Sequence, residues 1–179
     1  MSEQEYEEVI DEVEEFIPGR DGFVESEFGV PPISWEGVRV GTSFDYELLE
    51  HAEGQAYSYE PQREMGSGRI KYFMKDGKPT KNARMQYVVT MQTNLKDHDL
   101  TSDNHQARVA EAGLEDDGKR RLYIKGKENT EAFLEAVKAV AKAPEIGGRG
   151  TVTLVKRKPN PGFKATPIFS VTYTSPSPL

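Results

Sequence analysis

The sequence contains no cysteine, which excludes disulfides and thiolate metal sites and leaves the redox compartment open. No apolar run approaches the roughly 20 residues that a membrane-spanning helix needs. The first residues, SEQEYEEVIDEVEEF, are acidic, whereas a secretory signal peptide begins with basic residues. We therefore expect a cytoplasmic protein with no membrane partner.

The second scarcity concerns basic residues, and it is confined to one part of the chain. Residues 1–60 hold 17 acids and 2 bases, a net charge of −15, while residues 61–179 hold 13 acids and 21 bases, a net charge of +8. The overall charge of −7 and the pI of about 5.1 conceal this division. A basic majority of the chain favours a polyanionic partner such as nucleic acid.

Residues 1–34 are predicted to form an acidic leader and a linker rich in Gly and Pro. Apolar residues recur at helical spacing among the acids of the leader. Two interpretations remain open: a solvated leader, or an amphipathic acidic helix that docks on a partner protein or on the chain's own basic surface. In the second case the partner-binding residues are Tyr6, Val9, Val13 and Phe16.

A mainly β domain is predicted for residues 35–175, followed by a disordered tail at residues 176–179. Its first strand is expected to be long, with a bulge near Gly41, and to continue after Gly54. Residues 61–84 are predicted to project as a β-hairpin, because Lys75-Asp76-Gly77-Lys78 is a hairpin turn signal. Further strands are expected at residues 85–94, 121–125, 151–156 and 168–174, with a short helix at residues 106–112.

Residues 117–143 form the centre of this pattern. After the turn pair Asp117-Gly118, cationic or aromatic residues alternate with apolar ones, as in a half-buried strand. One strand face is therefore expected to be apolar, and the other is expected to carry Arg121, Tyr123 and Lys125. A helix follows, with Asn129 predicted as its N-cap. Its apolar stripe is predicted to contain Phe133, Leu134, Val137, Val140 and Ala141.

The order of strand, strand, strand, helix, strand, strand is that of an OB-fold, a five-stranded Greek-key barrel with its helix between strands 3 and 4. In this fold, single-stranded nucleic acid lies across β-strands 2 and 3, between the loops that join β-strands 1–2 and 4–5. The basic clusters fall at these places and contain aromatic rings, on which unpaired bases can stack. The predicted nucleic-acid-binding residues are Arg69, Lys71, Tyr72, Phe73, Lys75, Lys78, Lys81, Arg84, Arg121, Tyr123, Lys125, Lys156, Arg157, Lys158, Phe163 and Lys164.

Individual aromatic residues also have predicted positions. Trp35 is predicted to be a packing anchor, and Tyr87, Phe169 and Tyr173 are predicted to lie in the core. Tyr123 could either stack on bases or lie over its own sheet, and both readings stay open.

Residues 83–174 carry a strand that ends in Thr-Met-Gln-Thr (90–93), the string DGKRRLYIKG (117–126), a short helix, Ile-Gly-Gly (146–148) and a final aromatic strand. In these features the chain resembles the small single-stranded-DNA-binding-like OB-fold proteins of actinobacterial phages. The resemblance implies an accessory role in DNA replication or recombination, in the host cell cytoplasm, with replication or recombination proteins as partners of the acidic leader. It places Arg121, Tyr123 and Lys125 on the binding face. The chain departs from typical bacterial single-strand binders in being acidic at its N-terminus and not at its C-terminus.

An enzyme is not expected, and neither is a cofactor. His98 and His105 lie among acids in KDHDLTSDNH and could imitate a metal site, but they have no fixed helical spacing, and a hydrophilic loop is favoured. The acids at 115–117 precede a glycine, as in a turn. We therefore expect a non-catalytic protein that binds single-stranded DNA without strong sequence preference. The alternative is an OB-barrel adaptor that contacts a host or phage protein through the acidic leader.

Overall fold

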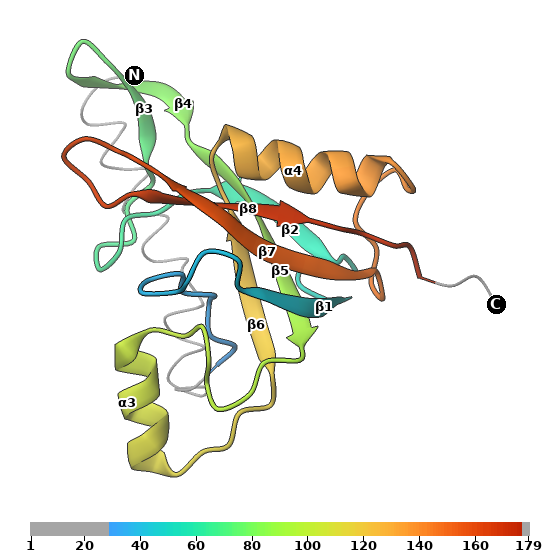
Figure 1. Cartoon of the computed structure of the whole chain (residues 1–179). Coiled ribbons are helices and arrows are strands. Elements are labelled where there is room, and N and C mark those ends of the chain that lie inside the picture. Colours follow the sequence, from blue (N-terminus) through green and yellow to red (C-terminus); the bar gives the residue numbers. More distant parts are fainter. Residues whose placement is uncertain (1–28, 177–179) are drawn as a thin grey trace. The chain divides into compact units, whose positions relative to one another are not determined.

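The computed structural model describes residues 29–176. The chain divides into two compact units, and within the described range one contains residues 59–86 and the other residues 30–58 and 87–176. Both are built mainly from antiparallel strands, and two helices are present in the described range (Figure 1). The predicted partner-binding residues Tyr6, Val9, Val13 and Phe16 lie outside the described residues. No helix of residues 29–176 is both long and apolar enough to cross a membrane.

The elements follow one another along the chain as a series of strands interrupted by two helices. In order they are β1 (Ser43–Leu49), β2 (Tyr57–Pro61), β3 (Tyr72–Lys75), β4 (Lys78–Ala83), β5 (Met85–Thr93), α3 (Asp103–Ala112), β6 (Lys119–Ile124), α4 (Lys127–Lys138), β7 (Arg149–Lys158) and β8 (Thr166–Val171).

The sheet of the larger unit is centred on β1, which pairs antiparallel with β5 on one side and with β7 on the other. Strand β6 pairs with β5, and β8 pairs with β7, so that one path of neighbours runs β6-β5-β1-β7-β8, and the sixth strand of the sheet, β2, also pairs with β5. The sheet is not closed within the described residues. Because side chains alternate between faces, every second residue of these strands turns into one core.

Trp35 is a packing anchor, as predicted. Its ring stacks on Phe44 of β1 and on Phe169 of β8, with centroid separations of 6.0 and 6.1 Å, and only 8% of its surface is exposed. Phe169 and Tyr173 are also buried, which confirms their predicted place in the core, and Tyr87 is partly buried against it.

The prediction of a long first strand, beginning with the apolar alternation at Val38 and Val40, was wrong in its first part. Regular strand structure begins only at Ser43, because Gly37 and Gly41 have positive φ angles of 73° and 97° and turn the chain before it. The apolar alternation at Val38 and Val40 thus belongs to turns, and Val40 is half exposed.

Helix α4 follows β6 directly and packs on β8 through the buried residues Phe133 and Val137, while α3 lies at the other end of β6 (Figure 1). The prediction of Asn129 as N-cap was wrong: Gly126 holds that position, with φ of 84°. Asn129 is buried, donates to Pro167 O at 2.9 Å and accepts from Phe169 N at 3.0 Å. Its side-chain amide therefore bonds the main chain of β8 as a neighbouring strand would.

The predicted apolar stripe of this helix also extended too far. Helix α4 ends at Lys138, and Val140 beyond it is 54% exposed. Leu134 and Ala141 are partly buried against the core, as the stripe requires.

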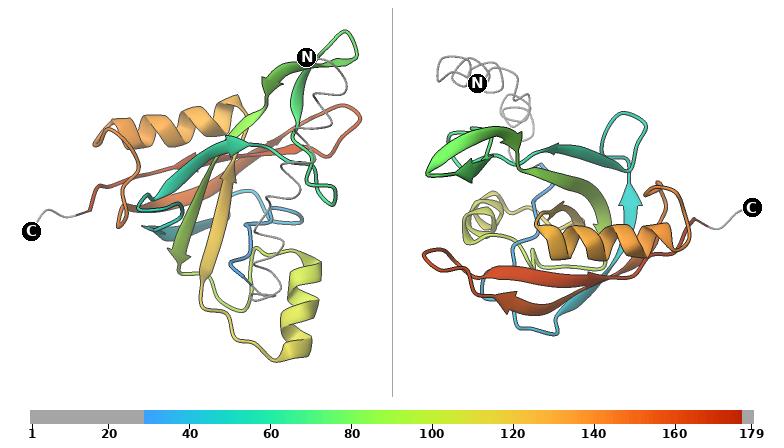
Figure 2. Two further views of the ribbon diagram at one scale, coloured as in Figure 1. Left: turned by 180° about the vertical axis from the view of Figure 1, so that it is seen from behind. Right: turned by 90° about the horizontal axis from the view of Figure 1, so that it is seen from above.

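The predicted hairpin is present in the smaller unit. Asp76 and Gly77 have φ angles of 53° and 76°, the left-handed pair that a two-residue type I′ turn requires. They connect β3 and β4 into a two-stranded antiparallel ribbon, seen with its turn at one end in Figure 2. Local turn chemistry was therefore sufficient to locate this element.

Candidate nucleic-acid interface

The β3–β4 hairpin and the residues that lead into it form a strongly basic segment. Residues 69–84 contain six bases and one acid, a net charge of +5. Lys75 and Lys78 lie directly opposite each other across the ribbon. None of the four lysines of this segment (Lys71, Lys75, Lys78 and Lys81) takes part in an ion pair of residues 29–176. Their positive charge is therefore not neutralised by this part of the chain.

Apolar and aromatic groups are interleaved with these cations. Phe73 is 50% exposed, and the guanidinium carbon of Arg84 lies 5.2 Å from the centroid of its ring, which is within the range of a cation–π contact. Met74 is 61% exposed and lies opposite Pro79, while Tyr72 is half-buried. Exposed apolar groups between cations suit unpaired bases, which have both charged phosphates and flat, weakly polar faces.

Main-chain hydrogen bonds hold the base of the hairpin. Gln62 N donates to Arg84 O at 2.7 Å, Lys71 N donates to Gln62 O at 2.9 Å, and Arg84 N donates to Lys71 O at 2.8 Å. The Gln62 side chain adds a bond to Met85 O at 2.9 Å. Three chain segments are thus joined where the ribbon begins, which fixes the strands that carry Phe73 and Arg84.

In the larger unit, β6 presents the second predicted contact surface. Arg121 lies opposite Thr90 and Tyr123 opposite Val88, so both side chains are on the same sheet face, away from Leu122 and Ile124. Both are partly exposed, and Lys125 just beyond the strand is exposed. Among residues 29–176, the Nε atom of Arg121 is the buried side-chain nitrogen or oxygen atom that has no hydrogen-bond partner.

The main chain of Arg121 is held from the other side. Its N–H donates to Pro31 O at 2.9 Å, and Ile33 N donates to its carbonyl oxygen at 2.8 Å. Residues 31–33 therefore cover the edge of β6 that β5 does not use, so the position of this arginine is fixed by bonds on both sides of the strand.

Arg120, which the sequence patterns did not single out, is fully buried beside these residues. Its guanidinium donates two bonds to the Asp116 carboxylate at 2.8 Å, two to Asp99 O and one to Lys119 O. All five donors are thus engaged. The hydrogen bonds from Arg120 hold the pKa of the Asp116 carboxyl far below its usual range.

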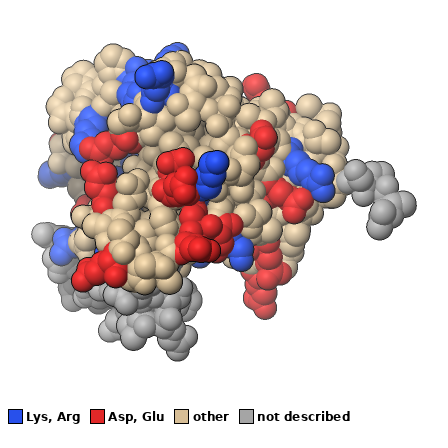
Figure 3. Space-filling model, turned by 60° about the horizontal axis from the view of Figure 1, so that its bottom comes forward, with Lys and Arg blue, Asp and Glu red and all other residues tan. Residues whose placement is uncertain are grey.

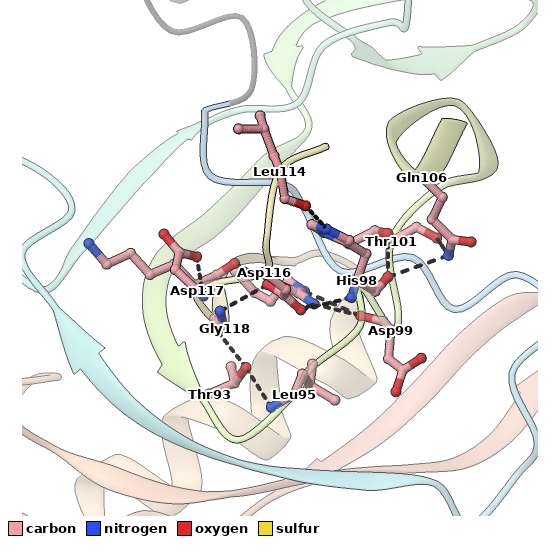
Figure 4. A network of polar contacts seen from close by, with 12 residues as sticks. Thr93, Leu95, His98, Asp99, Thr101, Gln106, Leu114, Asp116, Asp117 and Gly118 are labelled. Carbon is pink, nitrogen blue, oxygen red and sulfur yellow. Dashed lines mark hydrogen bonds and ion pairs between the residues drawn. The ribbon is translucent and has the colours of Figure 1, made fainter. Parts of the chain in front are cut away.

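Figure 4 shows that the same network joins the loop after β5 to the start of β6. Asp116 also accepts from His98 N and Gly118 N, both at 2.9 Å. His98 is bonded to Leu114 O through its ring, which meets the His105 ring edge-on at 5.8 Å, and burial lowers the pKa of His105. The network of hydrogen bonds fixes β6 in place. Residues 29–176 contain no group of three or more His, Asp or Glu side chains that could hold a metal ion.

The basic residues of segment 156–164, the C-terminal cluster, are bonded within the protein, unlike the lysines of the β3–β4 hairpin. Lys156 and Lys158 pair with Glu128 at 3.5 and 3.0 Å, and Lys164 pairs with Glu36 at 3.0 Å. The bond from Lys158 and the charge of Lys156 lower the pKa of Glu128. In the loop after β7, Phe163 is 79% exposed.

Arg157, the fourth cation of this cluster, serves the fold. It is half-buried, and its Nη2 atom donates to Trp35 O and Val38 O, both at 2.6 Å. The guanidinium thereby fixes the turn segment that carries the packing anchor Trp35.

Acidic surface lies elsewhere. The face of the molecule in Figure 3 carries several groups of acidic side chains and no continuous tract of Lys and Arg. The segment around α3, residues 97–117, contains seven acids and one base, Arg108. Such a segment repels phosphates, so we place no nucleic-acid contact on it.

The sequence did contain a signal for Arg120. Counting by two along β6 places it on the same face as Leu122 and Ile124, which is the core face.

No protein-family model, curated protein or solved structure matches this chain.

Proposed function

We propose that this chain is a non-catalytic protein that binds single-stranded DNA without strong sequence preference, and that the β3–β4 hairpin is its principal contact. The observation that carries the proposal is the pair Lys75 and Lys78, which lie opposite each other beside the exposed ring of Phe73 and have no acidic partner in residues 29–176.

Two like charges directly opposite each other destabilise a β-ribbon. A phosphate backbone offsets that repulsion, and the release of condensed counterions favours its binding. The open side of the Phe73 ring offers a surface for base stacking, a contact worth roughly 1–3 kcal/mol per base. A duplex presents phosphates without free base faces, so the combination of ring and cations favours single strands.

We further propose that the larger unit is an OB-type barrel. The neighbour order β6-β5-β1-β7-β8, with α4 between β6 and β7 in the chain, supports this assignment. Residues 31–33 on β6 and Asn129 on β8 cover the edges that a closed barrel would pair. The resemblance to phage single-stranded-DNA-binding-like proteins supports a role in replication or recombination.

Within this unit, Arg121, Tyr123 and Lys125 are the proposed contacts, because β6 corresponds to strand 3 of that fold. Phe163 adds an exposed ring, whereas we leave Arg157 out of the contact set because its Nη2 already donates twice to the main chain.

The test is a titration of labelled oligo-dT of about 16 nucleotides, followed by fluorescence anisotropy at several salt concentrations. The wild type is compared with Lys75→Gln/Lys78→Gln/Lys81→Gln. The matched control, Lys127→Gln/Lys138→Gln/Lys142→Gln, removes the same charge from exposed lysines in and just after α4. We expect the hairpin variant to bind at least about tenfold more weakly and to lose about 2 from its log–log salt slope, at about 0.7 per phosphate contact.

Equal loss in the hairpin variant and the control would mean that only net charge matters, and would overturn the assignment to the hairpin. Absence of binding to DNA and to the equivalent RNA, even at low salt, would overturn the function itself. The acidic leader as a protein-binding segment would then be the next hypothesis.

A further inference from the structure

Residues 63–70 form a tight turn before β3 begins, and hydrogen bonds close it. Glu64 N donates to Arg69 O at 2.8 Å, and Gly68 N donates to Glu64 O at 3.1 Å. The Arg63 side chain adds a bond from its Nη1 atom to Gly68 O at 3.1 Å. The turn is therefore held by its own bonds, and it is a separate projection from the β3–β4 ribbon (Figure 1).

Met65 lies at the exposed end of this turn. Its surface is 99% exposed, compared with 50% for Phe73 and 61% for Met74. Gly66, the next residue, has a φ angle of 86°, so the chain reverses directly after the methionine in a conformation that a side chain would strain. At the other end of the turn, Ile70 is buried and anchors it. The thioether of Met65 is thus held out into solvent by a bonded turn.

Basic residues continue from this turn toward the hairpin. The unit that contains both, residues 59–86, holds seven bases and three acids, a net charge of +4. Arg69 and Lys71 connect the turn to β3, and neither takes part in an ion pair of residues 29–176. A single exposed apolar residue is common on protein surfaces. Next to cations without acidic partners, however, it has the surroundings that an unpaired base with its phosphate requires.

We propose that Met65 is a second contact for unpaired DNA, with its side chain lying on the face of a base in the strand that the β3–β4 hairpin binds. The proposal rests on the proposed function, because it assumes that the hairpin binds this strand. The turn and the hairpin begin at one place, where main-chain bonds join Gln62, Lys71 and Arg84.

The chemistry of methionine suits such a contact. Its thioether is polarisable and makes favourable contacts with aromatic rings at a distance of about 5 Å. Methionine is also among the apolar residues that DNA-bending proteins insert between base steps. An apolar pocket of a partner protein would also accept a methionine, but the positive charge of residues 59–86 favours a polyanion.

Substitutions at Met65 separate a base contact from an electrostatic one. Met65→Ser should weaken the binding of labelled oligo-dT about fivefold, as the loss of one apolar contact with a base would give. The log–log salt slope should stay unchanged, since an uncharged side chain releases no counterions from the DNA. Met65→Leu keeps an apolar side chain of similar volume and should bind within about twofold of the wild type.

The matched control is Val140→Ser, which changes a 54% exposed apolar residue of the larger unit and should leave the affinity unchanged. Because Met65 is almost fully exposed, thermal unfolding of its variants should match that of the wild type.

The methionine methyl groups allow a test on the wild type itself. The chain has five methionines, whose methyl groups can be labelled with carbon-13 and observed by NMR. On addition of oligo-dA, the Met65 signal should move upfield, since the ring current of a base shields a methyl group that lies over it. Met91, which is 1% exposed, is the reference and should not move. A strand of the same length with abasic sugars should leave the Met65 signal in place.

Different results would overturn the contact and the function. If the wild type binds both oligonucleotides while the Met65 methyl signal stays fixed, or if Met65→Ser binds as tightly as the wild type, Met65 is not a contact and the single-strand function stands. A shallower salt slope in Met65→Ser would mean that the substitution displaced cations, which also overturns the base contact. If neither oligo-dT nor oligo-dA is bound, the function itself is wrong.

Discussion

The chain has two basic β-hairpins that look alike in sequence and differ in how their cations are bonded. Residues 69–84 hold six bases with Tyr72 and Phe73, and residues 156–164 hold four bases with Phe163. In the C-terminal hairpin all four cations have protein partners: two lysines share Glu128, one pairs with Glu36, and Arg157 bonds two carbonyls. In the β3–β4 hairpin the lysines have no ion pair in residues 29–176.

This difference shows that the density of basic residues does not by itself locate a nucleic-acid contact. A cation that already bonds the protein must give up those bonds to bind phosphate, and it contributes to stability instead. Arg120 is the extreme case, since it is fully buried and uses all five donors within the chain. The predictions below separate cations that serve the fold from cations that remain available.

The largest effect is expected at the buried pair. Asp116→Asn removes the charge that compensates Arg120, whose side chain is 0% exposed, while that of Asp116 is 5% exposed. Leaving a buried charge without its partner costs about 3 kcal/mol in the free energy of unfolding, which urea denaturation would measure. Oligo-dT affinity at a temperature where the variant is folded should not change, and a loss larger than about twofold would contradict a purely structural role.

The ion pair of Asp116 and Arg120 also predicts that the free energy of unfolding depends on pH. The pKa of Asp116 is lowered in the folded state from an unfolded value of about 3.9, so its stabilising contribution is complete above about pH 5 and is lost as the pH falls. The stability gap between wild type and Asp116→Asn should therefore narrow between about pH 5 and pH 3. A constant gap over that range, measured by urea denaturation at each pH, would refute the assignment.

Arg157→Met should lower the free energy of unfolding by about 2 kcal/mol, because two carbonyl oxygens, Trp35 O and Val38 O, lose a charged donor. Its effect on oligo-dT binding should stay within about twofold, in contrast to the hairpin lysines. A stable variant with strongly weakened binding would place Arg157 on the DNA and end the distinction between the two hairpins.

Glu128→Gln should release two lysines of the C-terminal hairpin from their acidic partner, as the lysines of the β3–β4 hairpin already are. It removes the carboxylate that holds Lys156 and Lys158, both of which are largely exposed. With these lysines released, oligo-dT affinity should rise by about threefold at low salt, and the salt slope should steepen by about 0.7 to 1.4 if one or two new phosphate contacts form. Unchanged affinity and slope would show that this surface does not meet the DNA.

The smallest effect concerns the stability of the β3–β4 hairpin. Lys78→Glu replaces two opposed lysines with an opposite-charge pair and should stabilise the protein by about 0.5 kcal/mol. Oligo-dT affinity should nevertheless fall, since a phosphate contact is replaced by repulsion. Thermal unfolding and anisotropy on the same sample would check both signs, and a gain in affinity would contradict the proposed contact.

Local patterns predicted much of the fold. The turn signal at residues 75–78 located the hairpin, alternation located β5, β6, β7 and β8, and the position of Trp35 after the linker indicated its packing role. One error lies where distant segments meet. Asn129 was predicted as a helix cap because its neighbours along the chain favour one, yet it bonds residues 167 and 169 of β8.

The candidate site was also predictable only in part. Its residue types and the alternation of Arg121 and Tyr123 follow from the sequence. The bonding of the C-terminal cations does not, since Arg157 and Trp35 are 122 positions apart and Lys164 and Glu36 are 128 apart. No local pattern encodes a contact of that range.

The charge division and the mainly β class follow from the amino-acid sequence alone, as do the hairpin turn and the places where cations and aromatic rings occur together. These depend on side-chain alternation and on backbone conformations that a few adjacent residues impose. Which cations the fold uses depends on tertiary contacts, because an ion pair or a bond to a carbonyl requires a partner that the folded chain brings within about 3 Å. That selection left the lysines of the β3–β4 hairpin without acidic partners in residues 29–176.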